Sequence, residues 1–486
     1  MYLDTSWDRF NPAKHYSAVL PLQGRVVLDS DAFEQAAISR YYLRAAMADV
    51  VGPAAAASGG FQISWAQEGS TSDLAVAPGR IYVGGILAEA AQGVTYLTQP
   101  DGYLDPSVPA DRLPAAGPYV VYLRVWERSV TAIQDQGIRE VALGIHGPDT
   151  AGRAQVVWQV VYWQPSDSEG QGGDDPQGAL QGWQRWQAGL GASAGTLKAR
   201  AKQPADAETD ICSVSPQAQY RGRENQNYRV EIFRAGTAQP GTVQSGTVQS
   251  GTVQSGTVQS GTVQSGGSQP ADQVAQYVWS RDAGSTAFPV ESLAGSEVTV
   301  STLGRDLVSS LEIEDWVEIA DDASASRVAD ERPPAHPRTL FQVTAIDAVN
   351  RVVTLSADPT ASIGTTGTDP TLHPLLRRWD SAGMTAVTEG QWLNLESGVQ
   401  VLFAGLKPDV PQDEGPASYR SGDYWLIPAR TVLADVIWSQ DDSGPRALPP
   451  LGVAYHYAPL AFVPDSGAPR DLRSTFNPIA LPPTFA

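Results

Sequence analysis

The side chains most able to act as metal ligands, general bases or nucleophiles are few and scattered in this chain of 486 residues. Its five histidines stand at His15, His146, His336, His373 and His456. No HExxH motif or other metal-ligand spacing joins them. The single cysteine, Cys212, excludes an intrachain disulfide and a cysteine-clustered zinc site, and a small buried residue fits it better than a catalytic thiol. The sequence therefore predicts no catalytic residue, no metal site and no cofactor.

Two glycine-containing motifs imitate catalytic loops. GASAG at residues 191–195 matches a nucleophile elbow around Ser193, but no apolar strand precedes it and the stretch is rich in Gly and Ala, so we interpret the match as coincidence. Residues 241–265 repeat GTVQS five times, with glycines spaced as in a phosphate loop but without its lysine. Each repeat carries one apolar residue and cannot bury a core, so we expect a spacer inserted in a hairpin loop.

Carboxylates and aromatic residues leave alternatives open. Adjacent aspartates at positions 174–175, 321–322 and 441–442 could hold calcium if loop carbonyls converged, or they could simply be solvated. A paired-carboxylate glycosidase also stays open, because the separation that matters for it is spatial. The 13 Trp and 17 Tyr could form a sugar-stacking or protein-docking platform, but we favour the interpretation that most fill thin β-domain cores.

The charge and the hydropathy of the chain limit the kinds of partner that we expect. The chain has 53 acidic against 33 basic residues and a net charge of −20, so it repels phosphate backbones and nucleic acid is not expected as a partner. No uninterrupted apolar run of about 18 residues is present, which predicts no membrane-spanning helix. No signal peptide is visible at the amino terminus, and we expect the chain to be cytoplasmic on synthesis.

One segment near the amino terminus indicates a helix. Asp31 can cap it, and the apolar residues Phe33, Ala37, Tyr41 and Ala45 follow at a spacing of four. Gly52 and Pro53 end it. Because Ile38, Tyr42 and Leu43 widen its apolar side, we expect it to pack against protein on more than one side. The neighbour could be its own β-domain or another subunit.

The remainder alternates with period two and predicts short strands. Half-buried strands are expected at 119–126 and 156–162, a hairpin of 228–233 with 276–279 that brackets the spacer, and further pairs at 340–346 with 351–356 and around 396–398. A short helix is expected near Trp183 and Trp186. The predicted fold class is mainly β, with several sandwich-like or barrel-like modules in tandem, one N-terminal helix and a flexible repeat insertion.

The expected modules follow one another along the chain. They are a docking strand and helix at 1–57, a first β-domain at 58–166, a Gly/Gln/Ser-rich linker at 167–212, a second β-domain at 213–310 with the repeat insertion at 236–270, a third β-domain at 311–461 and a tail at 462–486.

Several sequence segments, taken in order along the chain, resemble those of a known family. They include FNPAKHYSAVLPLQGRVVLDSDAFEQ from residue 10, YVVYLRVWERSVTA from 119, YRGRENQNYRVEIF from 220, DWVEIADD from 315 and GDYWLIPAR from 422. Together they resemble a poorly characterised family of β-rich proteins encoded among the structural genes of phage-tail-like contractile injection systems. The opening phrase is also similar to the start of phage tail and baseplate-associated proteins.

The resemblance implies a non-enzymatic structural component at the baseplate or tail-fibre region of such a particle. It implies multiple copies, homo-oligomers and contacts with baseplate, sheath or fibre proteins, and a place within an assembled particle that is released or membrane-associated. The docking residues expected on the N-terminal segment are Arg25, Asp31, Phe33, Tyr41 and Tyr42. One alternative is a tip or fibre protein that binds a glycan or receptor on the target-cell surface. Another is a particle-borne glycan hydrolase or lyase.

Overall fold

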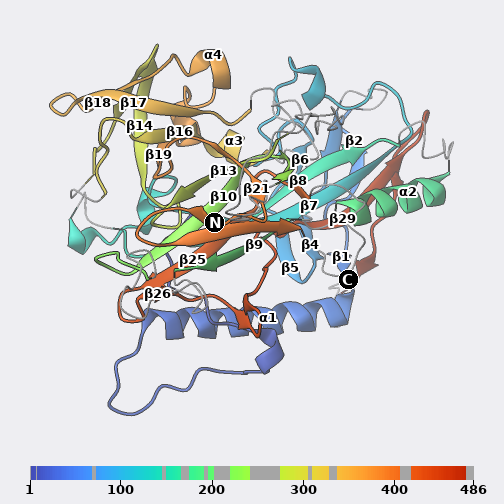
Figure 1. The fold of residues 1–486 in the computed structure, drawn as a ribbon. Coiled ribbons are helices and arrows are strands. Elements are labelled where there is room, and N and C mark those ends of the chain that lie inside the picture. The colour runs from blue at the N-terminus through green and yellow to red at the C-terminus, as the bar shows by residue number, and fades with distance from the viewer. Residues whose placement is uncertain are drawn as a thin grey trace, which may run out of the picture. The chain divides into compact units, whose positions relative to one another are not determined.

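The computed structural model describes residues 2–6, 8–67, 73–144, 149–165, 175–190, 195–201, 219–240, 274–304, 309–327, 337–405 and 417–477. The fold is mainly β, as the sequence predicts, with 38% strand against 16% helix (Figure 1). The chain forms two compact units. The first contains Met1–Gly191, Ala283–Arg378 and Val453–Ala486, and the second contains Ala192–Asp282 and Trp379–Gly452. Each unit therefore combines distant segments, whereas the expected modules were contiguous.

Three sheets form the β-part of the first unit outside its barrel. The first has the order β31-β1-β4-β5, the second β2-β3-β6 and the third β30-β29-β7-β8. The strands are β1 Ala54–Ala57, β2 Ile63–Trp65, β3 Leu74–Val76, β4 Gly79–Val83, β5 Ile86–Ala90, β6 Val94–Thr95, β7 Tyr119–Val130, β8 Arg153–Trp163, β29 His456–Val463, β30 Arg470–Asp471 and β31 Thr475–Phe476. The 3₁₀ turns are η1 Pro12–Lys14, η2 Pro109–Asp111, η3 Gln136–Ile138 and η4 Val141–Leu143.

Strand β7 is buried on both faces along residues 119–126, and β8 is buried on both faces along residues 157–161, so the predictions of half-buried strands at 119–126 and 156–162 are wrong. One face of β7 joins a core with Phe61, Ile81 and Trp158. The other face is covered by helix α2 (Pro176–Gly189), whose Trp183 is 2% exposed with its ring 5.7 Å from that of Tyr122. The short helix predicted near Trp183 is thus confirmed. It packs on a sheet, although the composition of its segment predicts a linker.

A closed barrel with the order β14-β15-β18-β17-β16-β19 completes the first unit. Val298, Val317 and Val353 are fully buried in its core, as alternating strand positions predict. The predicted pair at 340–346 and 351–356 is confirmed as the antiparallel strands β17 and β18. The elements are β14 Ala287–Ala294, β15 Glu297–Val300, β16 Trp316–Ala320, α3 Asp322–Ala325, β17 Leu340–Asp347, β18 Val352–Leu355, α4 Thr360–Ile363, η8 Pro370–Leu372 and β19 Leu375–Trp379.

The second unit holds two five-stranded sheets that share one core, with buried Val230, Phe403 and Trp425 among its members. The predicted hairpin around the spacer is confirmed, since β10 pairs with β13 antiparallel, as is the pair of β22 with β23. The strands are β9 Gly195–Arg200, β10 Gln226–Arg234, β11 Gly236–Thr237, β12 Gln239–Pro240, β13 Gln276–Ser280, β20 Thr385–Ala386, β21 Thr388–Glu389, β22 Leu393–Asn394, β23 Gln400–Gly405, β24 Ser418–Tyr419, β25 Tyr424–Arg430, β26 Asp435–Val436, β27 Gln440–Asp441 and β28 Gly444–Pro445.

Candidate functional site

Helix α1 (Asp29–Val51) begins two residues before the predicted cap. Asp31 occupies the third helical position, where its carboxylate accepts a hydrogen bond from the Leu28 amide at 3.2 Å. Its carboxylate also pairs with Arg9, and this contact, together with the Leu28 amide, lowers the pKa of Asp31. Arg9 lies 3.3 Å from Glu34 as well. Asp31 therefore orders the start of the helix and ties the preceding chain to it.

Helix α1 lies alongside strands β4 and β1 of its own unit (Figure 1). Its single buried residue is Ile38. The turn between β4 and β5 meets the helix backbone so closely that a Cβ atom at Gly85 would lie 2.3 Å from the Arg44 carbonyl oxygen. Arg44 also donates to Glu127 of β7 at 2.6 Å. These contacts fix one side of the helix.

The helix and the chain before it also expose apolar residues. Ten of the 19 large apolar side chains that are exposed in the described part of the chain lie within residues 16–50. We call this set the N-terminal apolar surface: Tyr16, Leu20, Leu22, Val26, Val27, Leu28, Tyr41, Tyr42, Leu43 and Val50. Scattered exposed apolar residues are normal, but a concentration of them marks an interaction site.

The first six of these residues belong to an arm, residues 15–28, that forms neither helix nor strand. Besides the contacts of Arg9, further contacts hold the arm and the chain before it beside α1. The Val19 amide donates to the Gln35 side chain at 2.8 Å, and the Phe10 ring lies 5.5 Å from that of Tyr41. Leu20 and Val26 remain 80% and 84% exposed. The arm thus presents apolar side chains outward from an anchored position.

The five predicted docking residues fall into three environments. Tyr41 and Tyr42 are 44% and 46% exposed with ring centres 5.6 Å apart, and Arg25 is exposed on the arm. Phe33 is half-buried. Asp31 is engaged within the N-terminal segment, as described above.

Sequence reasoning missed the exposed arm residues Leu20, Val26 and Val27. The sequence did contain a signal. Apolar residues stand on both sides of Gly24, and no later turn residue would fold them back into a core.

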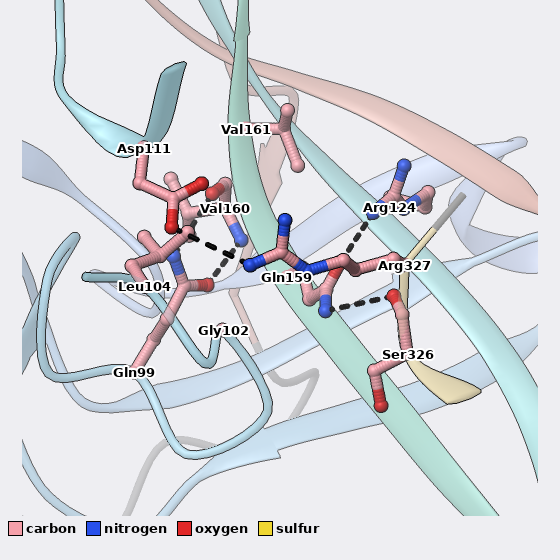
Figure 2. A pocket seen from close by; sticks show the side chains of 10 residues that line it. All are labelled: Gln99, Gly102, Leu104, Asp111, Arg124, Gln159, Val160, Val161, Ser326 and Arg327. Carbon is pink, nitrogen blue, oxygen red and sulfur yellow. Dashed lines mark hydrogen bonds and ion pairs between the residues drawn. The ribbon is translucent and has the colours of Figure 1, made fainter. Parts of the chain in front are cut away.

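A second candidate is a small polar cavity of about 30 Å³ in the first unit (Figure 2). Figure 2 shows Gln99 facing the edge of strand β8, where its amide accepts from the Val160 amide at 2.6 Å and donates to the Val160 carbonyl at 3.0 Å. Gln159 donates to the carbonyl oxygens of Asp101 and Ser326, and it accepts from Arg124. The cavity has room for about one water molecule.

Charged groups around this cavity are matched to protein partners. Arg327 lies 3.6 Å from the fully buried Asp111, whose carboxylate also accepts from the Asp105 amide at 3.0 Å. Burial raises the pKa of the Asp101 carboxyl, and burial likewise raises the pKa of Tyr103 to about 12. These polar groups occupy the hydrogen-bonding edge of β8. We therefore interpret the arrangement as one that protects the edge of a sheet.

The predicted carboxylate pairs are used in a similar way. Asp321 caps α3 by accepting from the Ser324 amide at 2.7 Å. Asp322 contacts Arg128 at 3.1 Å and His373 at 2.8 Å. Asp441 accepts from Ser443 in a turn. Within the described ranges, no group of three or more His, Cys, Asp or Glu side chains is placed to hold a metal ion. Ser193, Cys212, Asp174 and the GTVQS repeats lie outside the described residues.

Most of the tryptophans within strands fill cores, as favoured from the sequence. Trp126, Trp158 and Trp425 are at most 5% exposed. The indole N–H of Trp158 donates to the Glu89 carbonyl at 3.1 Å, and that of Trp425 donates to the Leu448 carbonyl at 2.9 Å. These side chains are therefore not available as a stacking platform.

Fold and surface together define a β-rich protein of several sheet modules with an exposed apolar N-terminal arm and helix. The chain belongs to the family described as a family of unknown function (DUF6519), whose model matches residues 1–182 and 188–481. No curated protein and no solved structure matches the chain significantly. Among the described residues, no helix combines the length and apolar character needed to span a membrane.

Proposed function

We propose that the protein is a non-enzymatic structural subunit of a phage-tail-like contractile injection particle, attached at its baseplate or tail-fibre region by the N-terminal apolar surface. The observation that carries the proposal is the concentration of exposed apolar side chains on residues 16–50. The sequence resemblance described above supplies the kind of assembly. The protein is made in the cytoplasm and acts within the assembled particle.

The mechanism is mechanical attachment. The arm and α1 meet neighbouring subunits, while the sheet modules project from that contact. Anchoring of α1 by Gly85 and Arg44 supports this role, because a docking element that is already ordered loses less conformational entropy on binding. Copies arranged around a symmetric particle engage together, so each single contact can be modest.

The test is co-purification with assembled particles. In the variant Leu20→Glu/Val26→Glu, two exposed arm residues become charged without disturbing a core. Burial of each aliphatic side chain contributes about 1.5 to 3 kcal/mol, so the loss is about 3 kcal/mol or more per contact, which is about two orders of magnitude in affinity. We expect the variant to be depleted from particles.

The matched control changes two equally exposed valines in turns of the sheet modules. Val349 and Val432 are 92% and 94% exposed, and Val349→Glu/Val432→Glu should stay in particles at the level of the unmodified chain. Equal retention of the arm variant and the control would contradict the proposed attachment.

A further inference from the structure

The turn between β4 and β5 contacts both helix α1 and a histidine of strand β29. The turn consists of Gly84 and Gly85, with φ of 59° and 75°, as a two-residue hairpin loop requires. A Cβ atom at Gly84 would come closer than 3.0 Å to three ring atoms of His456, and one at Gly85 would meet the Arg44 backbone equally closely. The Gly84 amide also donates to the Pro53 carbonyl, just after the helix, at 2.7 Å. The imidazole ring therefore packs against the turn that holds α1.

Charged groups of α1 and β7 lie beside this histidine. His456 stands opposite Val125 of β7, so Glu127, the next residue of β7 on that face, shares its side of the sheet. Glu127 accepts from Arg44 at 2.6 Å and lies 3.9 Å from Arg40 of the same helix. With a neutral imidazole, this group already carries two positive charges and one negative charge. A proton on His456 therefore increases an existing positive excess.

The other neighbouring elements, as far as the structure describes them, add no compensating charge. The turn is two glycines and β1 is alanine throughout. On β4, Arg80 pairs with Glu89 at 2.9 Å at the end of the strand away from the turn, and Tyr82 is neutral at acid pH. Tyr455 and Tyr457 flank His456 and point to the other face of the sheet. Protonation of His456 therefore acts on the contact between α1 and the sheet.

Helix α1 is held by few buried contacts, so one added charge can shift its balance. Ile38 is the only residue of the helix that is buried. Strand β7, in contrast, is buried along residues 119–126 without interruption. Elements with few buried apolar contacts open before the rest of a fold. Helix α1 can therefore separate from the sheet while β7 stays folded.

The pKa of His456 gives the direction of the effect. Burial lowers this pKa below its ordinary value, the nearby Arg44 lowers it further, and Glu127 opposes them in part. When α1 and the turn move away, the imidazole gains water and leaves Arg44, so the open form binds a proton more readily than the closed form. Opening of α1 is therefore favoured as pH falls below about 6.5, the unperturbed value, and it gains at most about tenfold per pH unit.

We propose that protonation of His456 frees α1 from the β4–β5 turn and from β7, so that mild acid releases the docking helix from the sheets of its own unit. The proton adds a positive charge beside Arg44, and it offers Glu127 a second cation in place of Arg44. The inference rests on the proposed function in treating α1 as the docking element, and it names the condition that loosens this element from the rest of the protein.

Hydrogen exchange of the isolated full chain, read by mass spectrometry, is the first test. Protection factors, which remove the intrinsic pH dependence of exchange, are compared at about pH 7.5 and about pH 5.5. We expect protection in α1 to fall about five- to tenfold over this range while β7 keeps its protection. In His456→Gln, whose amide cannot take up the proton, α1 protection should stay nearly constant. The matched control His373→Gln removes a histidine that contacts Asp322 at 2.8 Å, and its α1 should respond like that of the unmodified chain.

Three results overturn the proposal: α1 protection that does not change with pH, a loss that is equally large in His456→Gln, or a parallel loss in β7, which would mean that the whole unit opens. Histidine titration by NMR on the unmodified chain tests the same claim if the variant does not fold. The His456 ring should titrate below about pH 6.5 and the α1 signals should change with the same midpoint, whereas a higher or separate midpoint contradicts the proposal. A pH-insensitive α1 in a chain that still enters particles through its arm would refute this inference and leave the proposed function standing.

Discussion

The close contact between α1 and the β4–β5 turn can be tested by adding one methyl group to the turn. In Gly85→Ala the new Cβ would lie 2.3 Å from the Arg44 carbonyl oxygen and 2.7 Å from the Arg44 Cα, whereas ordinary contacts begin at 3.4 Å. Both groups are backbone, so the helix must move by about 1 Å. Moving it exposes part of Ile38, whose burial contributes about 1.5 to 3 kcal/mol. The left-handed backbone at Gly85, with φ of 75°, costs alanine about 1 to 2 kcal/mol more.

Gly295→Ala is the matched control because Gly295 has a similar φ of 58° and no atom within 4 Å of the added Cβ. It should cost about 1 to 2 kcal/mol from backbone conformation alone. Gly85→Ala should therefore cost about 3 to 5 kcal/mol in total. The assay is urea unfolding followed by circular dichroism, together with protease cleavage within α1. If the two variants were equally stable and α1 were equally protected from protease in both, the close contact described between α1 and the β4–β5 turn would be refuted.

Three further predictions concern other parts of the structure. Burial and the nearby Arg44 lower the pKa of His456, so the folded state resists its protonation and stability should fall as pH drops below about 6.5; His456→Gln should flatten this fall in thermal unfolding between pH 5 and 8. Trp183→Ala should destabilise the first unit by about 3 to 5 kcal/mol in urea, and a loss below about 1 kcal/mol would show that α2 does not cover the sheet. Arg281→Lys should cost the second unit about 1 kcal/mol, because lysine cannot reproduce the two bonds to Glu396 at 2.6 and 2.8 Å; an unchanged unfolding midpoint would count against that pairing.

Local patterns in the sequence predicted the local elements. The helix with its end at Gly52, the hairpin of β17 and β18, and the mainly β character all follow from spacing and turn residues within about 25 positions. The start of the helix was misplaced because Asp31 reaches back to the Leu28 amide from inside the first turn. A carboxylate in that place produces nearly the same sequence signature as a cap.

Long-range pairing could not be predicted. Strand β7 pairs with β29, with Tyr119 opposite Val463, and no local pattern links residues so far apart. Helix α2 then covers the face of β7 that alternation assigned to solvent. The barrel likewise joins segments that belong to two different expected modules. The division into discontinuous units follows from these pairings, which composition along the chain does not encode.

The candidate site was predictable in part. The spacing of apolar residues placed Tyr41 on the apolar side of the predicted helix, Tyr42 widened that side, and both are exposed. The direction in which the exposed residues point depends on which side of α1 meets the sheet. That side is set by the contacts of Gly85 and Arg44, which only the folded chain brings together.

The most direct test of the central claim is covalent labelling of side chains by hydroxyl radicals, read by mass spectrometry, on the isolated chain and on assembled particles. Attachment through the N-terminal apolar surface predicts that Leu20, Val26, Tyr41 and Tyr42 are labelled in the isolated chain and protected in the particle. Val349, which is 92% exposed, should be labelled equally in both. Unchanged labelling of the arm and helix on assembly would contradict the account.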